Sequence, residues 1–179
     1  NALTDLIEKY QQNPMVTEIY HRLATQYFNE GSQQAAAQGR EGARPNNEDN
    51  IPPRKKARDL CQEAIKKFPN AYGATLCKNL IIQIDQKQLS QQVELVNPPN
   101  QPILTSINYQ NINQIWFKAI PLTDGLISRL QKQNRQEQID TYNTITPVQQ
   151  WNQKLTDPGD FIDHQVELKI EGLYNSEKP

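Results

Sequence analysis

The sequence predicts an α+β fold, in which a short helical module is followed by an antiparallel β-domain. Up to residue 86, apolar residues recur at spacings of three and four, which is the period of amphipathic helices. From Ser90 onward, apolar and polar residues alternate in short runs separated by turn residues, which is typical of half-buried strands. Because helices do not alternate with these strands, an antiparallel sandwich is favoured over a parallel sheet. We expect the helical module over residues 1–88 and an incomplete β-sandwich over residues 89–179.

Four helices are expected in the helical module, at residues 2–12, 15–28, 54–68 and 71–86. The first helix ends at Asn13, because the residue before a proline avoids the α region. Pro14 suits the first turn of the second helix. The last two helices are hinged at Pro69. Their expected inward residues are Ala57, Leu60, Cys61, Ala64, Ile65 and Phe68, and then Tyr72, Leu76, Leu80 and Ile84.

The last of these helices carry the pattern of a tetratricopeptide-type repeat. Small residues at Ala57 and Ala64, with Pro69 after the helix, fit the second half of such a repeat. The helix at 15–28 would be the first half. One repeat is fewer than the number that normally stands alone, so we expect the β-domain or a neighbouring segment to complete its burial.

Residues 29–53 are expected to form a mobile loop inside the repeat. They hold few bulky apolar side chains and many Gly, Pro, Asn and charged residues, so they cannot bury enough surface to offset their ordering entropy. The basic run that follows, from Arg54 to Arg58, is partly offset by Asp59 and Glu63. We expect it to be a solvated helix face. The net charge of −1 gives no electrostatic reason to expect a nucleic-acid partner.

The β-domain is predicted from strand patterns at residues 90–95, 103–109, 115–122, 147–155 and 161–171. Turn chemistry separates them at 97–100, 110–113 and 157–160, where Pro, Asn, Asp and Gly gather. One helix is expected between the strands, near residues 126–138, with Leu126, Ile127 and Leu130 as its apolar anchor.

The ends of the chain indicate a piece of a longer protein. The sequence opens on Asn1 instead of a methionine, and the last strand pattern stops soon after a turn-like segment. We therefore expect the last strand of the β-domain to lie beyond Pro179. No apolar run approaches the length of a membrane span and no signal-peptide pattern is present, so we expect no membrane contact from this segment itself.

Cys61 and Cys77 form the first candidate site. Each lies about eight residues from the helix hinge, so antiparallel packing places both at a similar height, ~12 Å along each helix at the α-helical rise. In an oxidising compartment they would form a disulfide. The alternative is a pair of small buried apolar residues, which is a common state of free cysteines.

Aromatic residues form the second candidate site. Trp116 and Phe117 are neighbours on a strand, so one faces the core and the other faces outward as a possible interface. Trp151 is expected to fill the core or an inter-domain contact. On the helices, exposed Tyr20, Tyr27 or Tyr72 would line a concave peptide-binding face.

The sequence predicts no catalytic, cofactor or metal residues. His21 and His164 are the only histidines, and Asp163 points to the opposite face of the strand from His164. The sequence contains no Gly-x-Ser-x-Gly elbow, dinucleotide fingerprint, phosphate-binding loop or His-Glu-x-x-His motif. We therefore expect a non-enzymatic segment.

Three stretches carry a family resemblance: KFPNAYGATLCKNLI at residues 67–81, VELVNPPNQPILTSINYQNINQIWFKAI at 93–120, and PVQQW…LTDPGDFIDHQVELKIEGL at 147–173. Together they resemble the N-terminal region of large bacterial alpha-2-macroglobulin-like proteins, in particular those of Bacteroidetes. In that family a tetratricopeptide-like helical segment precedes the first macroglobulin-like β-sandwich. The resemblance covers residues 54–173 well and the first helices loosely, and it is a pattern of strands and turns without a catalytic signature.

The resemblance implies a periplasmic or outer-membrane-associated protein that is implicated in protease trapping. Trapping in that family uses a bait region and, in many members, a thioester made by Cys and Gln. Cys61 and Cys77 lack the Cys-x-x-Gln spacing, so the implied role of this segment is structural and docking. Its implied partners are other domains of the same chain and, through the full-length protein, proteases. The alternative is a standalone helical-repeat adaptor that binds a peptide or an envelope protein.

Overall fold

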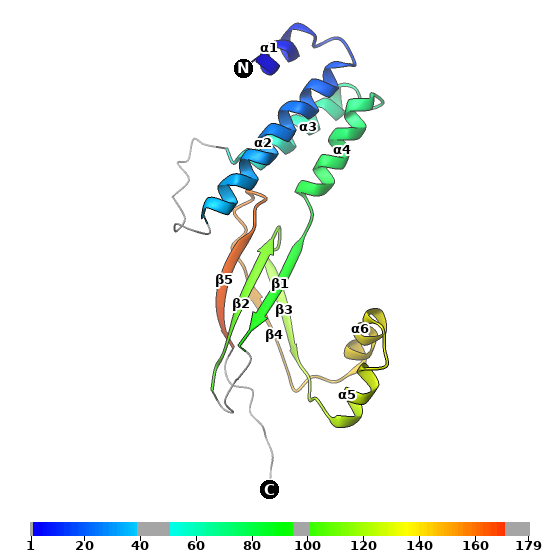
Figure 1. The fold of residues 1–179 in the computed structure, drawn as a ribbon, viewed down its shortest axis with the longest axis vertical. Helices are drawn as coiled ribbons and strands as arrows, with labels where there is room; N and C mark the ends of the chain where they lie inside the picture. Colours follow the sequence, from blue (N-terminus) through cyan, green and yellow to red (C-terminus); the bar gives the residue numbers. More distant parts are fainter. Residues whose placement is uncertain (1, 39–50, 95–100, 171–179) are drawn as a thin grey trace. The chain divides into compact units, whose positions relative to one another are not determined.

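The computed structural model describes residues 2–38, 51–94 and 101–170, which form six helices and five strands (Figure 1). The fold is α+β, with a helical module and then antiparallel sheets that make a partial sandwich, as the sequence predicts. The helices are α1 (Ala2–Lys9), α2 (Val16–Gln38), α3 (Pro53–Lys67), α4 (Tyr72–Ile84), α5 (Asp124–Leu130) and α6 (Arg135–Thr144). The strands are β1 (Gln88–Val93), β2 (Ile103–Gln110), β3 (Gln114–Ala119), β4 (Gln149–Lys154) and β5 (His164–Ile170).

The chain divides into two compact units that do not follow a single cut in the sequence. The helical unit comprises residues 1–91, 107–112 and 157–166, and the β-unit comprises residues 92–106, 113–156 and 167–179. The predicted boundary between residues 88 and 89 lies inside β1, and the helical unit also takes short segments from much later in the chain.

The prediction of a mobile loop over residues 29–53 is wrong for its first part. α2 continues to Gln38 instead of ending near residue 28, and α3 begins at Pro53. The loop prediction for residues 39–50 lies outside the described residues. The segment from Gly31 to Gln38 is rich in Ala and Gln, which are good helix formers, so α2 continues without the apolar stripe on which the prediction relied.

The core of the helical unit lies between α2, α3 and α4. Small residues meet there, and Ala24, Ala57, Ala64 and Ala74 are fully buried together with both cysteines. Gly73 is buried where α4 packs against the start of α2. A Cβ placed on it would lie 2.4 Å from the backbone carbon of Thr17. Small side chains at these positions allow the helix axes to approach closely, which gives the dense packing of this core.

The backbone carbonyls at the C-terminal end of α4 accept hydrogen bonds from a residue in the turn after β2. The side chain of Asn111 donates to the carbonyls of Ile84, at 2.8 Å, and of Gln86, at 3.0 Å. The first carbonyl belongs to the last residue of α4 and the second to the segment just after it, and neither has a partner within the helix. Asn111 has a positive φ of 55°, which asparagine tolerates better than most residues.

The basic run on α3 is more buried than the predicted solvated face. Arg54 donates to the carbonyl of Phe161 at 2.6 Å and to the hydroxyl of Ser32 at 3.0 Å. Arg58 makes two bonds to the carboxylate of Asp85, at 2.7 and 3.1 Å. Only Lys55 in this run is exposed to the extent that the prediction assumed.

The strands form two sheets. One sheet has three strands in the order β1-β2-β5, and the other pairs β3 with β4. β3 and β4 are antiparallel, and their register sets Phe117 opposite Trp151 and Trp116 opposite Asn152. The turn predicted at residues 97–100 lies outside the described residues.

The single helix predicted at 126–138 is two helices in the structure. The hydroxyl of Thr123 accepts from the backbone of Leu126 and caps α5. Asn134 begins α6 through a capping box with Glu137, in which each side chain accepts from the other's backbone N–H. This pair supplies a strong start signal, so a new helix begins there instead of the first one continuing.

Candidate functional site

An open groove in the helical unit lies beside α1 and the first turns of α2. Its volume is about 550 Å³. We call it the α1–α2 groove. Its apolar lining includes Leu3, Leu6, Tyr10, Met15, Ile19 and Leu76.

The turn between α1 and α2 is built by local hydrogen bonds. The side chain of Asn13 accepts from the backbone N–H of Met15 at 3.0 Å, and its carbonyl accepts from Val16 at 2.9 Å. The hydroxyl of Thr17 donates to the carbonyl of Pro14 at 2.8 Å. Asparagine and threonine commonly hold turns in this way. Met15 therefore lies on an ordered turn, with its side chain exposed.

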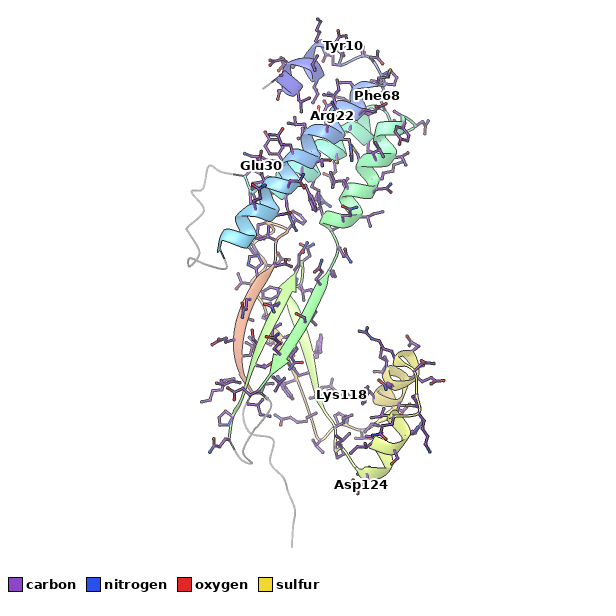
Figure 2. The ribbon with its side chains drawn as sticks, in the orientation of Figure 1. Tyr10, Arg22, Glu30, Phe68, Lys118 and Asp124 are labelled. Carbon is purple, nitrogen blue, oxygen red and sulfur yellow. The ribbon has the colours of Figure 1, made fainter. Side chains whose placement is uncertain are left out.

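The rim of the α1–α2 groove is polar. Glu18, His21 and Arg22 line it from α2, and Figure 2 shows Arg22 on that helix and Tyr10 just after α1. Burial lowers the pKa of His21, so its imidazole is neutral at pH 7. Three apolar residues of the lining, Leu6, Tyr10 and Met15, are exposed. An apolar surface with a mixed polar rim is suited to holding a protein segment.

The tyrosines expected on a concave face do not share one environment. Tyr20 is fully buried, which corrects its prediction as an exposed interface residue. Tyr27 is half-buried, and the ammonium of Lys56 lies 5.8 Å from the centre of its ring. Tyr72 is exposed, although the helical pattern also placed it on the inward stripe of α4.

The hydroxyl of Tyr20 belongs to a three-residue cluster. It donates to the carboxylate of Glu63 at 2.7 Å and accepts from Lys67 at 2.9 Å, and Lys67 also pairs with Glu63 at 2.7 Å. Burial raises the pKa of Tyr20. The hydrogen bond from Lys67 lowers the pKa of Glu63. The cluster joins α2 to α3, and this satisfied network is a packing feature.

The two cysteines lie together in the core of the helical unit. Both are free thiols with no exposed surface, and they are neighbours across α3 and α4. The interaction with Cys77, together with burial, raises the pKa of the Cys61 thiol, so that the thiol is protonated at neutral pH. The predicted similar height of the two residues is confirmed. A disulfide between them in an oxidising compartment stays a prediction.

The adjacent aromatics on β3 have different surroundings. Trp116 is 67% exposed. Phe117 is half-buried and stacks on Trp151, with ring centres 5.1 Å apart and planes at 10°. The sequence predicts that one member of the pair is packed and the other faces outward, and this holds with Trp116 as the outward residue.

His164, on β5, has a partner that the sequence does not predict. Its Nε2 lies 2.8 Å from the carboxylate of Asp160, and its ring lies 5.6 Å from that of Tyr109. Asp160 is buried and also accepts from the backbone of Ile162. The sequence pattern places Asp160 in a turn. Its position four residues before His164 is the one sequence feature that indicates the Asp160–His164 pair.

Phe161 is the second feature that the sequence did not reveal. It has a φ of 62°, which is unusual for a bulky side chain. The guanidinium of Arg58 lies 5.5 Å from the centre of its ring, and Arg54 binds its carbonyl. Burial lowers the pKa of Arg54. The two arginines therefore hold a strained backbone position in place by contacts distant in sequence.

Among the described residues, no group of three or more His, Cys, Asp or Glu side chains is arranged to hold a metal ion. None of the described helices is both long enough and apolar enough to cross a bilayer. Comparison with protein-family models, with curated proteins and with solved structures finds no match. The family resemblance therefore stays a prediction, as does everything that it implies.

Proposed function

We propose that this chain is a non-catalytic structural and docking segment of a longer alpha-2-macroglobulin-like protein of the bacterial envelope. The observation that supports docking is the α1–α2 groove, where an ordered turn presents exposed apolar side chains beside a hollow of about 550 Å³. Exposed apolar side chains around such a hollow are costly in water unless a partner covers them. The proposed occupant is an apolar segment of another domain of the same longer chain.

The segment-specific test is photo-crosslinking in the full-length protein. A photoreactive residue replaces Met15 in the groove, and the matched control carries it at Ile82 on α4. These two side chains are exposed to the same extent, 68% and 69%, and Ile82 does not line the groove. A crosslink from position 15 alone to another domain of the same chain supports the proposal. A crosslink to a separate protein supports the adaptor alternative, and equal or absent crosslinking at both positions overturns docking at this groove.

The protease-trapping role needs its own experiment on the full-length protein. Incubation with a broad-specificity protease, followed by size-exclusion chromatography for retained protease and by denaturing gels and mass spectrometry for cleavage and covalent capture, distinguishes the outcomes. Cleavage at one region with retention of the protease supports a trap, whether or not the capture is covalent. If the protein is neither cleaved at a defined region nor able to retain the protease, the trap is overturned and the adaptor alternative is favoured.

A further inference from the structure

The pairing of β3 with β4 brings six side chains onto one face of a two-stranded ribbon in the β-unit. The register pairs Gln114 with Lys154, Trp116 with Asn152, and Lys118 with Gln150. Residues that face each other across antiparallel strands project from the same side, and alternate residues share that side. We call this the Trp116 face. Lys118 lies on β3 in Figure 2.

The opposite face of the ribbon is the packed one. It carries Ile115, Ala119 and the stacked pair Phe117 and Trp151, and the first two are buried. The apolar groups that the ribbon needs for stability are therefore on that side. Trp116 is on the other side and is 67% exposed, so its indole is not needed to fill the core.

The Trp116 face combines an apolar plate with hydrogen-bonding groups. The amide of Gln114 donates to the side-chain oxygen of Asn152 at 3.0 Å, so the N–H donors of Asn152 are directed away from that bond. Gln150 adds a second amide at the other end of the face. A sugar ring has the matching pattern, with apolar C–H groups on its face and hydroxyls at its edge.

The charge of the Trp116 face is positive. Of its six residues two are lysines and none is acidic. Lys154 and Lys118 lie toward opposite ends, with Trp116 between them. Four residue steps along β3 span about 13 Å, which is the length of a short oligosaccharide. Lys118 is also held by a 3.0 Å hydrogen bond from its ammonium to the carbonyl of Tyr142, so part of its flexibility is already lost.

We propose that the Trp116 face binds an acidic polysaccharide, with a sugar ring stacked on the indole and anionic groups near the two lysines. A protein hot spot would place the tryptophan in a pocket closed to water, whereas here it lies on an open, polar strip. Single-stranded nucleic acid also uses stacking and cations, but it normally meets a continuous basic groove, and this face has two separated lysines. The proposal does not depend on the α1–α2 groove.

The test is a titration of the purified chain with an oligogalacturonate, in which calorimetry and tryptophan fluorescence measure binding. The matched ligand is the same oligosaccharide with its carboxylates methyl-esterified, which keeps the rings and removes the charge. A thymidine oligonucleotide is the third ligand. We expect the acidic oligosaccharide to bind most tightly, and to bind more weakly as the salt concentration rises.

The variants separate stacking from charge. Trp116→Ala should weaken binding of the acidic oligosaccharide about tenfold, whereas Tyr72→Ala, an equally exposed aromatic in the helical unit, should leave it unchanged. Lys118→Gln together with Lys154→Gln should weaken binding of the acid but not of the ester. Circular dichroism and the melting temperature should confirm that each variant folds.

Each contrary result overturns the proposal. Absence of binding to the acidic oligosaccharide does so, as does binding that Trp116→Ala leaves unchanged. Equal affinity for the acid and the ester overturns the assignment to acidic sugars. Tighter binding of the oligonucleotide through Trp116 replaces the polysaccharide with single-stranded nucleic acid.

Discussion

The helical unit and the β-unit bury their side chains very differently. In the helical unit Ile84 and the two cysteines have no exposed surface, and Tyr20 is buried with its hydroxyl paired on both sides. In the described part of the β-unit the most buried apolar side chain is Ile115, at 6% exposed. β4 leaves five of its six side chains exposed, and only Trp151 is half-buried.

This difference follows from the residues that meet in each unit. α2, α3 and α4 present alanines, cysteines and Gly73 to one another, so that their backbones approach closely and large side chains fill the remaining space. A two-stranded ribbon has only one face that packs, and its other face is free to carry polar groups. The helical unit thus contains most of the stabilising burial, and the β-unit offers more surface for recognition.

The largest expected effect comes from a cavity in the core of the helical unit. Ile84→Ala removes a side chain with no exposed surface and should lower the free energy of unfolding by about 3 kcal/mol. Leu89→Ala, on β1, is the matched control because this side chain is 55% exposed, and its cost should stay below about 0.5 kcal/mol. Urea unfolding of both variants measures the difference. Similar losses would contradict the contrast between core helices and exposed strands.

A smaller effect is expected where two helices touch at a glycine. Gly73→Ala places a methyl group 2.4 Å from the backbone carbon of Thr17, so α2 and α4 must separate. The expected loss is about 2 kcal/mol. Gly125→Ala, on α5, meets no atom within 4 Å and should be neutral or slightly stabilising, because alanine favours a helix. Thermal unfolding of the two variants is the measurement, and a neutral Gly73→Ala would show that the helix contact is loose.

The smallest effect is the pH-dependent contribution of Glu63. The pKa of this carboxyl is lowered by its hydrogen bond from Lys67, so its contribution to stability is complete above the unfolded pKa of about 4.3. The contribution is lost as the pH falls through the lower folded-state pKa. Because Glu63 and Lys67 are partly exposed, Glu63→Gln should cost about 0.5 kcal/mol at pH 7. Urea unfolding at pH 7 and at pH 3 should show this cost and then a smaller one; a constant cost would assign it to hydrogen bonding alone.

Helices with strong apolar periodicity have the predicted bounds, whereas those whose ends depend on a single contact do not. The apolar stripes place α3 and α4 within two residues of their observed ends, and the hinge at Pro69 is confirmed. The sequence does not predict the extension of α2, because Gly31 and Ser32 pack against Arg54. Arg54 lies after residues 39–50, so this contact is not visible in the local sequence. The break between α5 and α6 was missed because the capping pair Asn134 and Glu137 was not recognised.

The candidate sites divide in the same way. Alternation along β3 predicts that Trp116 and Phe117 face opposite sides, and the helical rise predicts that Cys61 and Cys77 are neighbours. Neither rule predicts which aromatic faces outward, because that depends on where Trp151 lies across the strand pair. Periodicity also does not decide whether Tyr20 is buried, since it is the pairing of its hydroxyl with Glu63 and Lys67 that lets a polar group enter the core.

By itself, the sequence determined the α+β class, the order of helices and strands apart from the break between α5 and α6, and the similar height of the two cysteines on their helices. These properties arise from local periodicity and from the geometry of single elements. The tertiary structure decided which residues line the α1–α2 groove, that Asp160 and Phe161 belong to the helical unit, and which residues form the Trp116 face. Each of these brings together residues from separate elements, and strand register and helix crossing are set by packing of the whole unit, which no short window of sequence contains.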